Sequence, residues 1–272
     1  MSIISENVCN LKKDFVKLYK GNRHIQELLP LAKTDFLPIP DDHLASLSKF
    51  IQSNPIYDNT FEMNISEIKY DIHEGDLNEY WLNSIKHDTS YAPFYPTWLL
   101  SAYVLAAKAK EFGFSHLVDI GSGDGRIAYC GQTVGIESTS IEIDSELINL
   151  QNDIIQNSKT CFNTINTDAT QINYDDLKFT HPIFFIGGVP QNGEILADSI
   201  IKNVLNSSSI ETCCFVLTGT LTKEKFSKDQ SNFGWGVTVK KFNLNEIETI
   251  VLPTYWTMDQ PFETPYLFTK YT

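Results

Sequence analysis

The stretch from Leu117 to Cys130, LVDIGSGDGRIAYC, holds the residues of this chain whose types and spacing best suit the binding of a small ligand. Residues of buried-strand character lead into glycines at 121, 123 and 125, and residues typical of a helix start follow. Glycine lacks Cβ, so the backbone of such a turn accepts positive φ angles and lets a ligand approach closely. The pattern predicts a strand, a ligand-cradling turn and a helix.

The spacing of these glycines argues against a dinucleotide ligand. The dinucleotide fingerprint places its third glycine three residues after the second, as GxGxxG, whereas this chain has GxGxG. Asp119 precedes the turn and Asp124 lies inside it. Both acids are unfavourable neighbours for a pyrophosphate and suitable ones for a cationic ligand.

Two further acids follow at the ends of the next two predicted strands. Residues 138–144 read as a strand that ends near Glu142, about twenty residues past the glycines, where a carboxylate can accept both hydroxyls of a ribose. Residues 163–169 end in Asp168 and Ala169, where an adenine amino group would be recognised. The sequence therefore predicts a nucleoside site built from three successive strand ends.

These residues resemble the class I S-adenosylmethionine-dependent methyltransferases, and the resemblance is clearest over residues 91–220. It implies a doubly wound α/β fold with a seven-stranded, mostly parallel sheet that ends in an antiparallel hairpin, and S-adenosyl-L-methionine as cofactor. It also implies a set of cofactor-binding residues: Asp119, Gly121, Ser122, Gly123, Asp124, Gly125, Arg126, Glu142, Ile143, Asp168, Ala169 and Gly187.

The string DIGSGDGRI, preceded by YAPFYPT at residues 91–97, is also similar to a narrower group, the archaeal protein-lysine methyltransferases related to the non-SET histone lysine methyltransferases. This resemblance implies transfer of a methyl group to a protein lysine. GSGDG also occurs in methyltransferases of other substrates, so two alternatives stay open. They are a small-molecule N- or O-methyltransferase and a non-catalytic protein that binds S-adenosylmethionine.

Two segments are expected to supply the residues that contact the methyl acceptor. Prolines hold residues 91–97 extended before a helix, and Tyr91 and Tyr95 are the expected aromatic walls for an amine, through cation–π and hydroxyl contacts. The apolar run 183–186 reads as a buried parallel strand that ends at Gly187, and Gln191 shortly after it is expected to orient the amine. We expect no metal ion. Base-methylating enzymes often carry Asn or Asp followed by Pro-Pro-Tyr here, and this chain does not.

The remaining elements follow from hydrophobic patterning. Residues 1–90 are predicted to form a helical cap, with helices at residues 8–19, 25–31, 41–53 and 77–85, before a cofactor-binding domain at residues 91–272. This cap either roofs the substrate pocket or has a structural or dimerisation role. Later strands are predicted at residues 212–217, 235–244, 248–252 and 265–271.

Composition narrows the possible partners. The net charge is −13 with a pI near 4.8, and Arg23 and Arg126 are the only arginines, so a general grip on a nucleic-acid backbone is not expected. No run approaches the length of a membrane span, and the five cysteines show no CxxC spacing. We expect a cytoplasmic protein that acts on a protein or a small molecule; the oligomeric state is left open.

Overall fold

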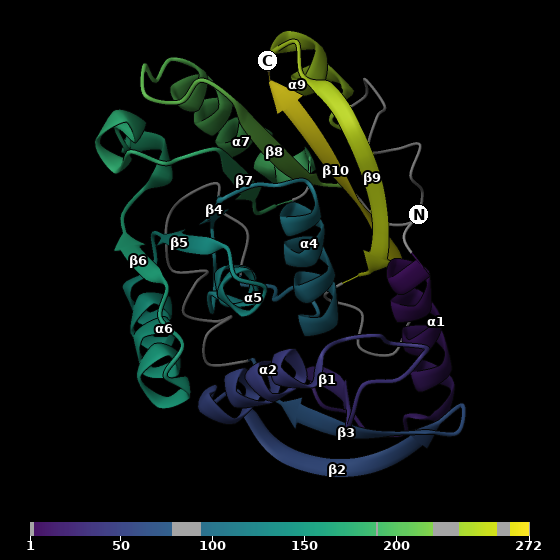
Figure 1. Ribbon diagram of the computed structural model, residues 1–272. Helices are drawn as coiled ribbons and strands as arrows, with labels where there is room; N and C mark the ends of the chain where they lie inside the picture. The colour runs from purple at the N-terminus through teal and green to yellow at the C-terminus, as the bar shows by residue number, and fades with distance from the viewer. Residues whose placement is uncertain (1–2, 78–93, 189, 220–233, 255–261, 272) are drawn as a thin grey trace.

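The computed structural model describes residues 3–77, 94–188, 190–219, 234–254 and 262–271. Its largest element is a seven-stranded sheet with strand order β6-β5-β4-β7-β8-β10-β9 (Figure 1). The first five strands in this order run parallel, and β10 runs antiparallel to both β8 and β9. The predicted doubly wound sheet with a terminal antiparallel hairpin is confirmed. Its strands are β4 (His116–Ile120), β5 (Glu137–Glu142), β6 (Asn163–Asn166), β7 (Pro182–Ile186), β8 (Cys213–Thr218), β9 (Asn245–Pro253) and β10 (Glu263–Tyr271).

Helices cover both faces of this sheet. On one face lie α4 (Leu99–Glu111), α5 (Arg126–Thr133) and α6 (Ser145–Ser158), whose apolar residues share a core with Ile183, Phe185 and Val216. On the other face lie α7 (Pro190–Leu205), the 3-10 turns η1 (Ala169–Gln171) and η2 (Tyr174–Leu177), and α9 (Gly236–Lys241). The strand order reverses between β4 and β7, so the carboxyl ends of these strands border a crevice, which is where open α/β sheets bind ligands.

The amino-terminal region is not all helical, which corrects the expected helical cap. Helices α1 (Ile3–Leu18) and α2 (Asp41–Ser53) occur as predicted, but β1 (Ile25–Pro30), β2 (Tyr57–Ile65) and β3 (Ile68–Gly75) form a separate antiparallel sheet with order β1-β3-β2. In Figure 1, α2 lies between this sheet and the helices α5 and α6, and α1 lies beside β9. The helix predicted at residues 77–85 falls almost entirely outside the described residues.

The helix predicted at residues 25–31 is wrong for a physical reason. Every residue of β1 is buried, including Gln26 and Glu27, so the strand lacks the alternation of exposed and buried residues that identifies a strand in sequence. The spacing of Ile25, Leu28 and Leu29 then matches a helix equally well. Pairing of β1 with β3 decides the outcome, since tertiary contacts override a local pattern of this length.

The strand predicted at residues 235–244 is also wrong, because this segment contains the short helix α9. The β-branched run Val237, Thr238, Val239 has strand propensity, but side-chain contacts hold the helical form. The buried Trp235 donates from Nε1 to the carbonyl of Thr218 (2.8 Å), and Thr238 donates to Asp198 of α7 (3.0 Å).

One core joins the amino-terminal region to the large sheet. Val8, Leu11 and Phe15 of α1 and Leu28 of β1 belong to the same buried cluster as the residues of α4, α5 and the adjoining sheet face. In the part of the chain that the structure describes, no helix combines the length and the apolar character that crossing a membrane requires.

Candidate functional site

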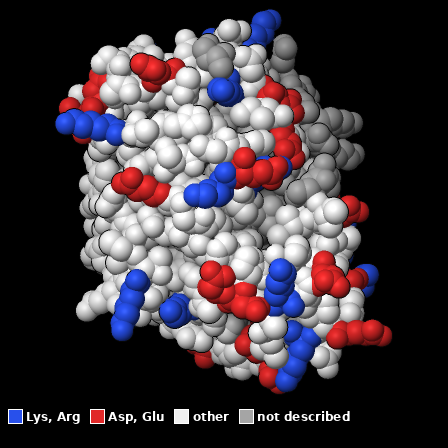
Figure 2. Space-filling view, viewed as in Figure 1, with Lys and Arg blue, Asp and Glu red and all other residues white. Residues whose placement is uncertain are grey.

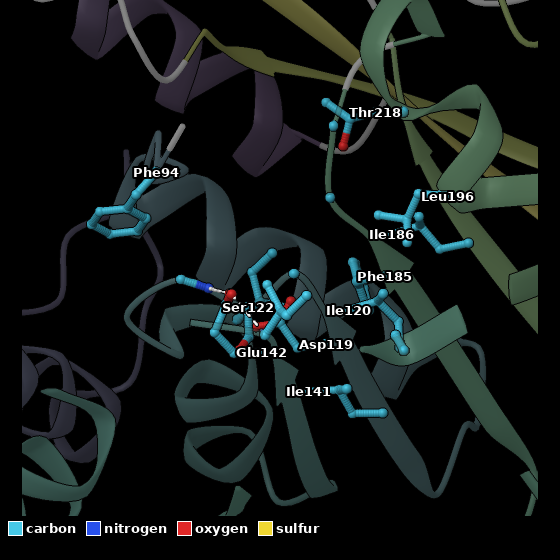
Figure 3. Close-up of a pocket in the computed structure, with 18 of the residues that line it drawn as sticks. Phe94, Asp119, Ile120, Ser122, Ile141, Glu142, Phe185, Ile186, Leu196 and Thr218 are labelled. Atoms are coloured by element: carbon cyan, nitrogen blue, oxygen red, sulfur yellow. Dashed lines mark hydrogen bonds between the residues drawn. The ribbon is translucent and has the colours of Figure 1, made fainter. Parts of the chain in front are cut away.

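A cavity of about 210 Å³ opens at the carboxyl edge of the large sheet. Its walls come from the ends of β4, β5, β7 and β8, the glycine turn, the segment 94–97, the start of α7 and one residue of β10. In Figure 3, Asp119, Ser122 and Glu142 lie close together near the glycine turn, while Ile186, Leu196 and Thr218 stand apart from them on another part of the wall. The cavity therefore has an acidic part and an apolar part.

The glycine turn has the conformation that its sequence predicts. Gly121, Gly123 and Gly125 have φ angles of 66°, 58° and 76°, in the left-handed region that side-chain-bearing residues rarely adopt. A Cβ at Gly121 would meet nothing within 4 Å, whereas a Cβ at Gly123 would lie 2.3 Å from the ring of Phe94. The turn thus presents bare backbone to the cavity at Gly121 and packs against an aromatic ring at Gly123.

Glu142 stands at the end of β5 and is buried in the cavity wall. Its Oε1 accepts the backbone N–H groups of Ile143 (2.9 Å) and Asp144 (3.0 Å), and its Oε2 accepts that of Gly123 (2.9 Å). Burial raises the pKa of Glu142, and these three N–H groups oppose the rise. The bonds fix the carboxylate against the glycine turn, where the sequence predicts a contact with a sugar.

Those three bonds also limit what Glu142 can still accept. A carboxylate offers about four lone-pair positions, so about one remains for a ligand. The predicted acceptance of both ribose hydroxyls therefore requires one backbone N–H group to yield its place.

Asp119, the penultimate residue of β4, lies on the same wall and is buried. Burial raises the pKa of Asp119 to about 8; the N–H of Ala128 (3.4 Å) opposes this rise, and the charges of Asp124 and Glu142 add to it. The carboxyl group is therefore largely protonated at neutral pH. A cation placed beside it would favour the ionised form.

The other predicted cofactor residues on this wall are Ser122, Ile143, Asp168, Ala169 and Gly187, and all five line the cavity. Asp168 caps η1, where its Oδ1 accepts the N–H (2.9 Å) and the hydroxyl (2.7 Å) of Thr170. A Cβ at Gly187 would lie 3.0 Å from the carbonyl of Ile120, so a small residue is needed where β7 passes the glycine turn.

Asp124 and Arg126 were predicted to contact the cofactor, but their charged groups turn toward the amino-terminal sheet. Arg126 donates from Nε (2.9 Å) and Nη2 (2.5 Å) to the Asp124 carboxylate and from Nη1 to Glu27 of β1 (2.7 Å). Asn54, at the end of α2, donates to Asp124 (3.0 Å). Both charged side chains line the cavity, yet their polar atoms are committed to this network.

The rest of the network ties three segments to the glycine turn. Tyr57 donates to Glu27 (3.0 Å) and accepts from Arg126 (3.1 Å), and the backbone N–H of Leu99 donates to Glu27 (2.8 Å). The carbonyl of Thr97 accepts from Arg126 (2.6 Å). Five side chains take part in this network, and we call them the Arg126 cluster: Glu27, Asn54, Tyr57, Asp124 and Arg126.

Four members of the Arg126 cluster are buried and Tyr57 is half-buried, and the charges of the cluster depend on one another. Burial raises the pKa of Glu27, and the guanidinium of Arg126 opposes that rise. Burial alone would lower the pKa of Arg126, but the neighbouring carboxylates outweigh it and the pKa rises. The network thus holds the Arg126 guanidinium between the carboxyl groups of Glu27 and Asp124, next to the glycine turn.

Gln151 does not line the cavity but supports the glycine turn, and the sequence analysis missed it. Its Nε2 donates to Ser122 Oγ (2.9 Å) and to the carbonyl of Gly123 (2.7 Å), and its Oε1 accepts from Ser140 (2.5 Å). Gln151 is fully buried on α6. The sequence feature that could have revealed Gln151 is its position: it is a polar residue four positions after Leu147, within the apolar stripe of a predicted helix.

The predicted acceptor residues are only partly placed. Tyr95 lines the cavity and is 41% exposed, so it stands at the rim. Tyr91 lies outside the described residues, and for Gln191 the structure describes the backbone within α7 but not the side chain. The role predicted for each of these three residues stays a prediction.

The apolar part of the cavity was not predicted. Ile195 and Leu196 of α7 line it, and Ile195 is 70% exposed. In Figure 3, Phe94 lies across the cavity from Leu196, while Val216 of β8 and Tyr266 of β10 also line the cavity. None of the described residues that line the cavity is a histidine, a lysine or a cysteine.

Comparison with known proteins finds no matching family model and no matching curated sequence. Among solved structures, the chain is similar to the Pyrococcus abyssi tRNA (uracil-54, C5)-methyltransferase in complex with S-adenosyl-L-homocysteine, with 13% identity, 78% of this chain and 44% of that chain covered, and a TM-score of 0.47. It is similar to M. jannaschii TYW2 in complex with AdoMet (13% identity, 62% and 75% covered, TM-score 0.44). It is also similar to TrmN from Thermus thermophilus (11% identity, 76% and 57% covered, TM-score 0.44).

The chain spans less than half of the first of these proteins. With identities and TM-scores this low, the assignment of the fold rests on the strand order of the sheet. That order and the terminal hairpin make this chain a seven-stranded, Rossmann-like α/β protein.

Proposed function

We propose that this chain is an S-adenosylmethionine-dependent methyltransferase whose acceptor presents an amine. The observation that carries the proposal is the position of Glu142. Its carboxylate is fixed by three backbone N–H groups beside a turn of positive-φ glycines, at the edge where the strand order reverses. Asp168 follows at the end of the next strand along the sheet.

The residues present fit this cofactor. Glu142 suits the ribose hydroxyls, and Asp168 with Ala169 suits the adenine end. Bare backbone at Gly121 leaves room for the methionine part near the end of β7. The cofactor supplies an activated methyl group; the chain contributes binding and alignment of the two reactants, which account for most of the rate in such displacements.

The charges of the cavity favour an amine acceptor. Five acids line it, namely Asp119, Asp124, Glu142, Asp144 and Asp168; of these, Asp119 is largely protonated at neutral pH and Asp124 pairs with Arg126. Among the described lining residues the one basic side chain is Arg126, whose guanidinium is committed to Glu27 and Asp124. On the face shown in Figure 2, lysines and arginines are scattered among acids rather than gathered into a basic surface. This distribution favours a cationic partner over a polyphosphate backbone.

A protein lysine is the leading acceptor because the glycine-turn string and the aromatic segment before it resemble lysine methyltransferases. Support for this finer assignment is limited to that resemblance and to the acidic cavity. Two similar structures are named as a tRNA methyltransferase and a putative RNA methyltransferase, and the names of the neighbours compared above include no lysine acceptor. A small-molecule acceptor and cofactor binding without catalysis are the competing functions.

The test incubates the full chain and labelled S-adenosylmethionine with a cell lysate and then separates protein, RNA and small molecules. We expect label in the protein fraction, and mass spectrometry to place it on lysine side chains as methylamine. Label confined to RNA or to metabolites would contradict the lysine assignment. Binding of the cofactor without transfer to any fraction would contradict the methyltransferase function itself.

The pKa of Asp119 leads to a prediction about pH. Its carboxyl group is protonated below about pH 8, so a sulfonium cation bound nearby gains the attraction of a carboxylate only as the pH rises toward that value. Affinity for S-adenosylmethionine should therefore increase between pH 6 and pH 8 and then level off. Equilibrium dialysis over this range measures it.

S-adenosylhomocysteine is the matched control because its sulfur carries no charge. Its affinity should follow a flatter pH profile than that of S-adenosylmethionine, and Asp119→Asn should remove the difference between the two ligands. Parallel profiles in the unaltered chain would show that Asp119 does not sense the charge on the sulfur.

A further inference from the structure

The buried hydroxyl of Tyr266 makes no hydrogen bond of ordinary geometry with a described residue, although the side chain of Thr97 in the cavity wall lies close enough to affect its pKa. Tyr266 belongs to β10, is 2% exposed and lines the cavity. Three other buried polar atoms in the described part share this property, but none lies on a residue that lines the cavity; they belong to Gln26, His73 and Ser101.

A buried tyrosine hydroxyl normally finds a hydrogen-bond partner, since leaving one unmade costs about 1–3 kcal/mol. The surroundings of this hydroxyl show where a partner would come from. Tyr266 pairs with Thr218 of β8 across the sheet, and Val216 and Thr97 line the same cavity. Because Tyr266 is itself a lining residue, a ligand in the cavity is the source of a partner that the described residues leave open.

Burial raises the pKa of Tyr266 well above its usual value, and the Thr97 side chain opposes the rise only in part. The hydroxyl therefore keeps its proton over the whole physiological range. It can donate or accept a hydrogen bond, but it cannot act as a base.

We propose that the Tyr266 hydroxyl accepts a hydrogen bond from the reacting amine of the acceptor, and that Phe94, Ile195 and Leu196 hold the apolar stem that carries this amine. This inference rests on the proposed methyltransferase function and adds the class of substrate: a neutral primary amine on an aliphatic stem. Tyr266 is a positioning residue in this arrangement.

The chemistry of the walls favours an amine over a hydroxyl. A hydroxyl acceptor needs a base to take its proton. No histidine lines the described part of the cavity, and of the lining acids Asp119 is largely protonated at neutral pH and Asp124 pairs with Arg126. A neutral amine attacks the methyl carbon with its own lone pair. The carbon–nitrogen bond forms, the carbon–sulfur bond breaks with its electron pair going to sulfur, and the resulting methylammonium later loses its proton to water. The apolar wall lowers the pKa of the amine and so favours the neutral form.

The experiment measures binding rather than turnover and has two steps. Calorimetry first measures S-adenosylhomocysteine binding to the full chain. Ligand-observed NMR then follows n-butylamine at pH 9.5 in the S-adenosylhomocysteine complex of the unaltered chain, of Tyr266→Phe and of Tyr271→Phe. Tyr271 lies on the same strand but does not line the cavity, so it is the matched control.

We expect Tyr266→Phe to weaken n-butylamine binding about five- to tenfold, which corresponds to one hydrogen bond, and to leave the S-adenosylhomocysteine affinity unchanged. Tyr271→Phe should change neither affinity. The Tm of Tyr266→Phe should equal or exceed that of the unaltered chain, because removing an unpartnered hydroxyl relieves its burial cost.

Equal n-butylamine affinity in the unaltered chain and Tyr266→Phe would overturn the inference. A lower Tm for Tyr266→Phe would also overturn it, since it would reveal a structural partner for the hydroxyl. Failure of S-adenosylhomocysteine to bind in the first step would instead overturn the proposed function, so the two failures are distinguishable.

Discussion

Glu142→Ala is expected to lower the affinity for S-adenosylhomocysteine about 100-fold. The change removes a carboxylate that would accept from the ribose, and hydrogen bonds to charged groups contribute about 1.5–3 kcal/mol each. It also removes the bond from the Gly123 N–H that ties the glycine turn to β5, and it leaves the N–H groups of Ile143 and Asp144 without this acceptor. Isothermal titration calorimetry measures the loss.

Glu146→Ala is the control for this change. Glu146 is an exposed acid in the first turn of α6, four residues away, and it does not line the cavity. Its removal alters the net charge equally and should leave the affinity unchanged. An unaltered affinity in Glu142→Ala, with circular dichroism showing an intact fold, would refute the assignment of a nucleoside to this cavity.

Arg126→Met is expected to destabilise the folded chain by about 3–5 kcal/mol. The substitution leaves the carboxylates of Glu27 and Asp124 buried without their cation. Removing one partner of a buried ion pair lowers the free energy of unfolding more than replacing both partners, because it leaves a buried charge uncompensated. In a chain of this size each kcal/mol shifts the Tm by roughly 2–4 °C, so the Tm should fall by about 10 °C. Thermal unfolding followed by circular dichroism measures the shift.

The chain supplies its own control, since Arg23 is its only other arginine. Arg23 pairs with Asp58 at the surface, and an exposed pair contributes at most about 1 kcal/mol, so Arg23→Met should change the Tm little. The triple variant Glu27→Gln, Asp124→Asn, Arg126→Met should recover part of the stability, because it removes the uncompensated charges. Equal losses for Arg23→Met and Arg126→Met would refute the structural role of the Arg126 cluster.

The sequence predicted the acidic wall of the cavity because its parts are local. The glycine turn, Glu142 and Asp168 each follow a recognisable strand, and parallel strands that are neighbours in a sheet bring their carboxyl ends to one edge. Knowing the strand types was therefore enough to place these residues together.

The parts that the sequence did not predict depend on contacts between distant segments. Glu27 meets Arg126 across 99 positions, and nothing near either residue indicates the other. The same burial that hides Glu27 also removes the alternation that would have identified β1 as a strand. Tyr266 was read correctly as part of a strand, but its place in the cavity depends on the pairing of β10 with β8.

The position of α1 has a consequence for the order of folding. This helix packs against β9, Cys9 contacts the carbonyl of Val251 across 242 positions, and Lys13 pairs with Glu263 (2.6 Å). During synthesis α1 leaves the ribosome long before these strands exist, and contacts of such high sequence separation form slowly. Until β9 and β10 emerge, α1 can pack only on its earlier partners, among them α4 and β2, and the side that meets β9 stays open to chaperones and to misassociation.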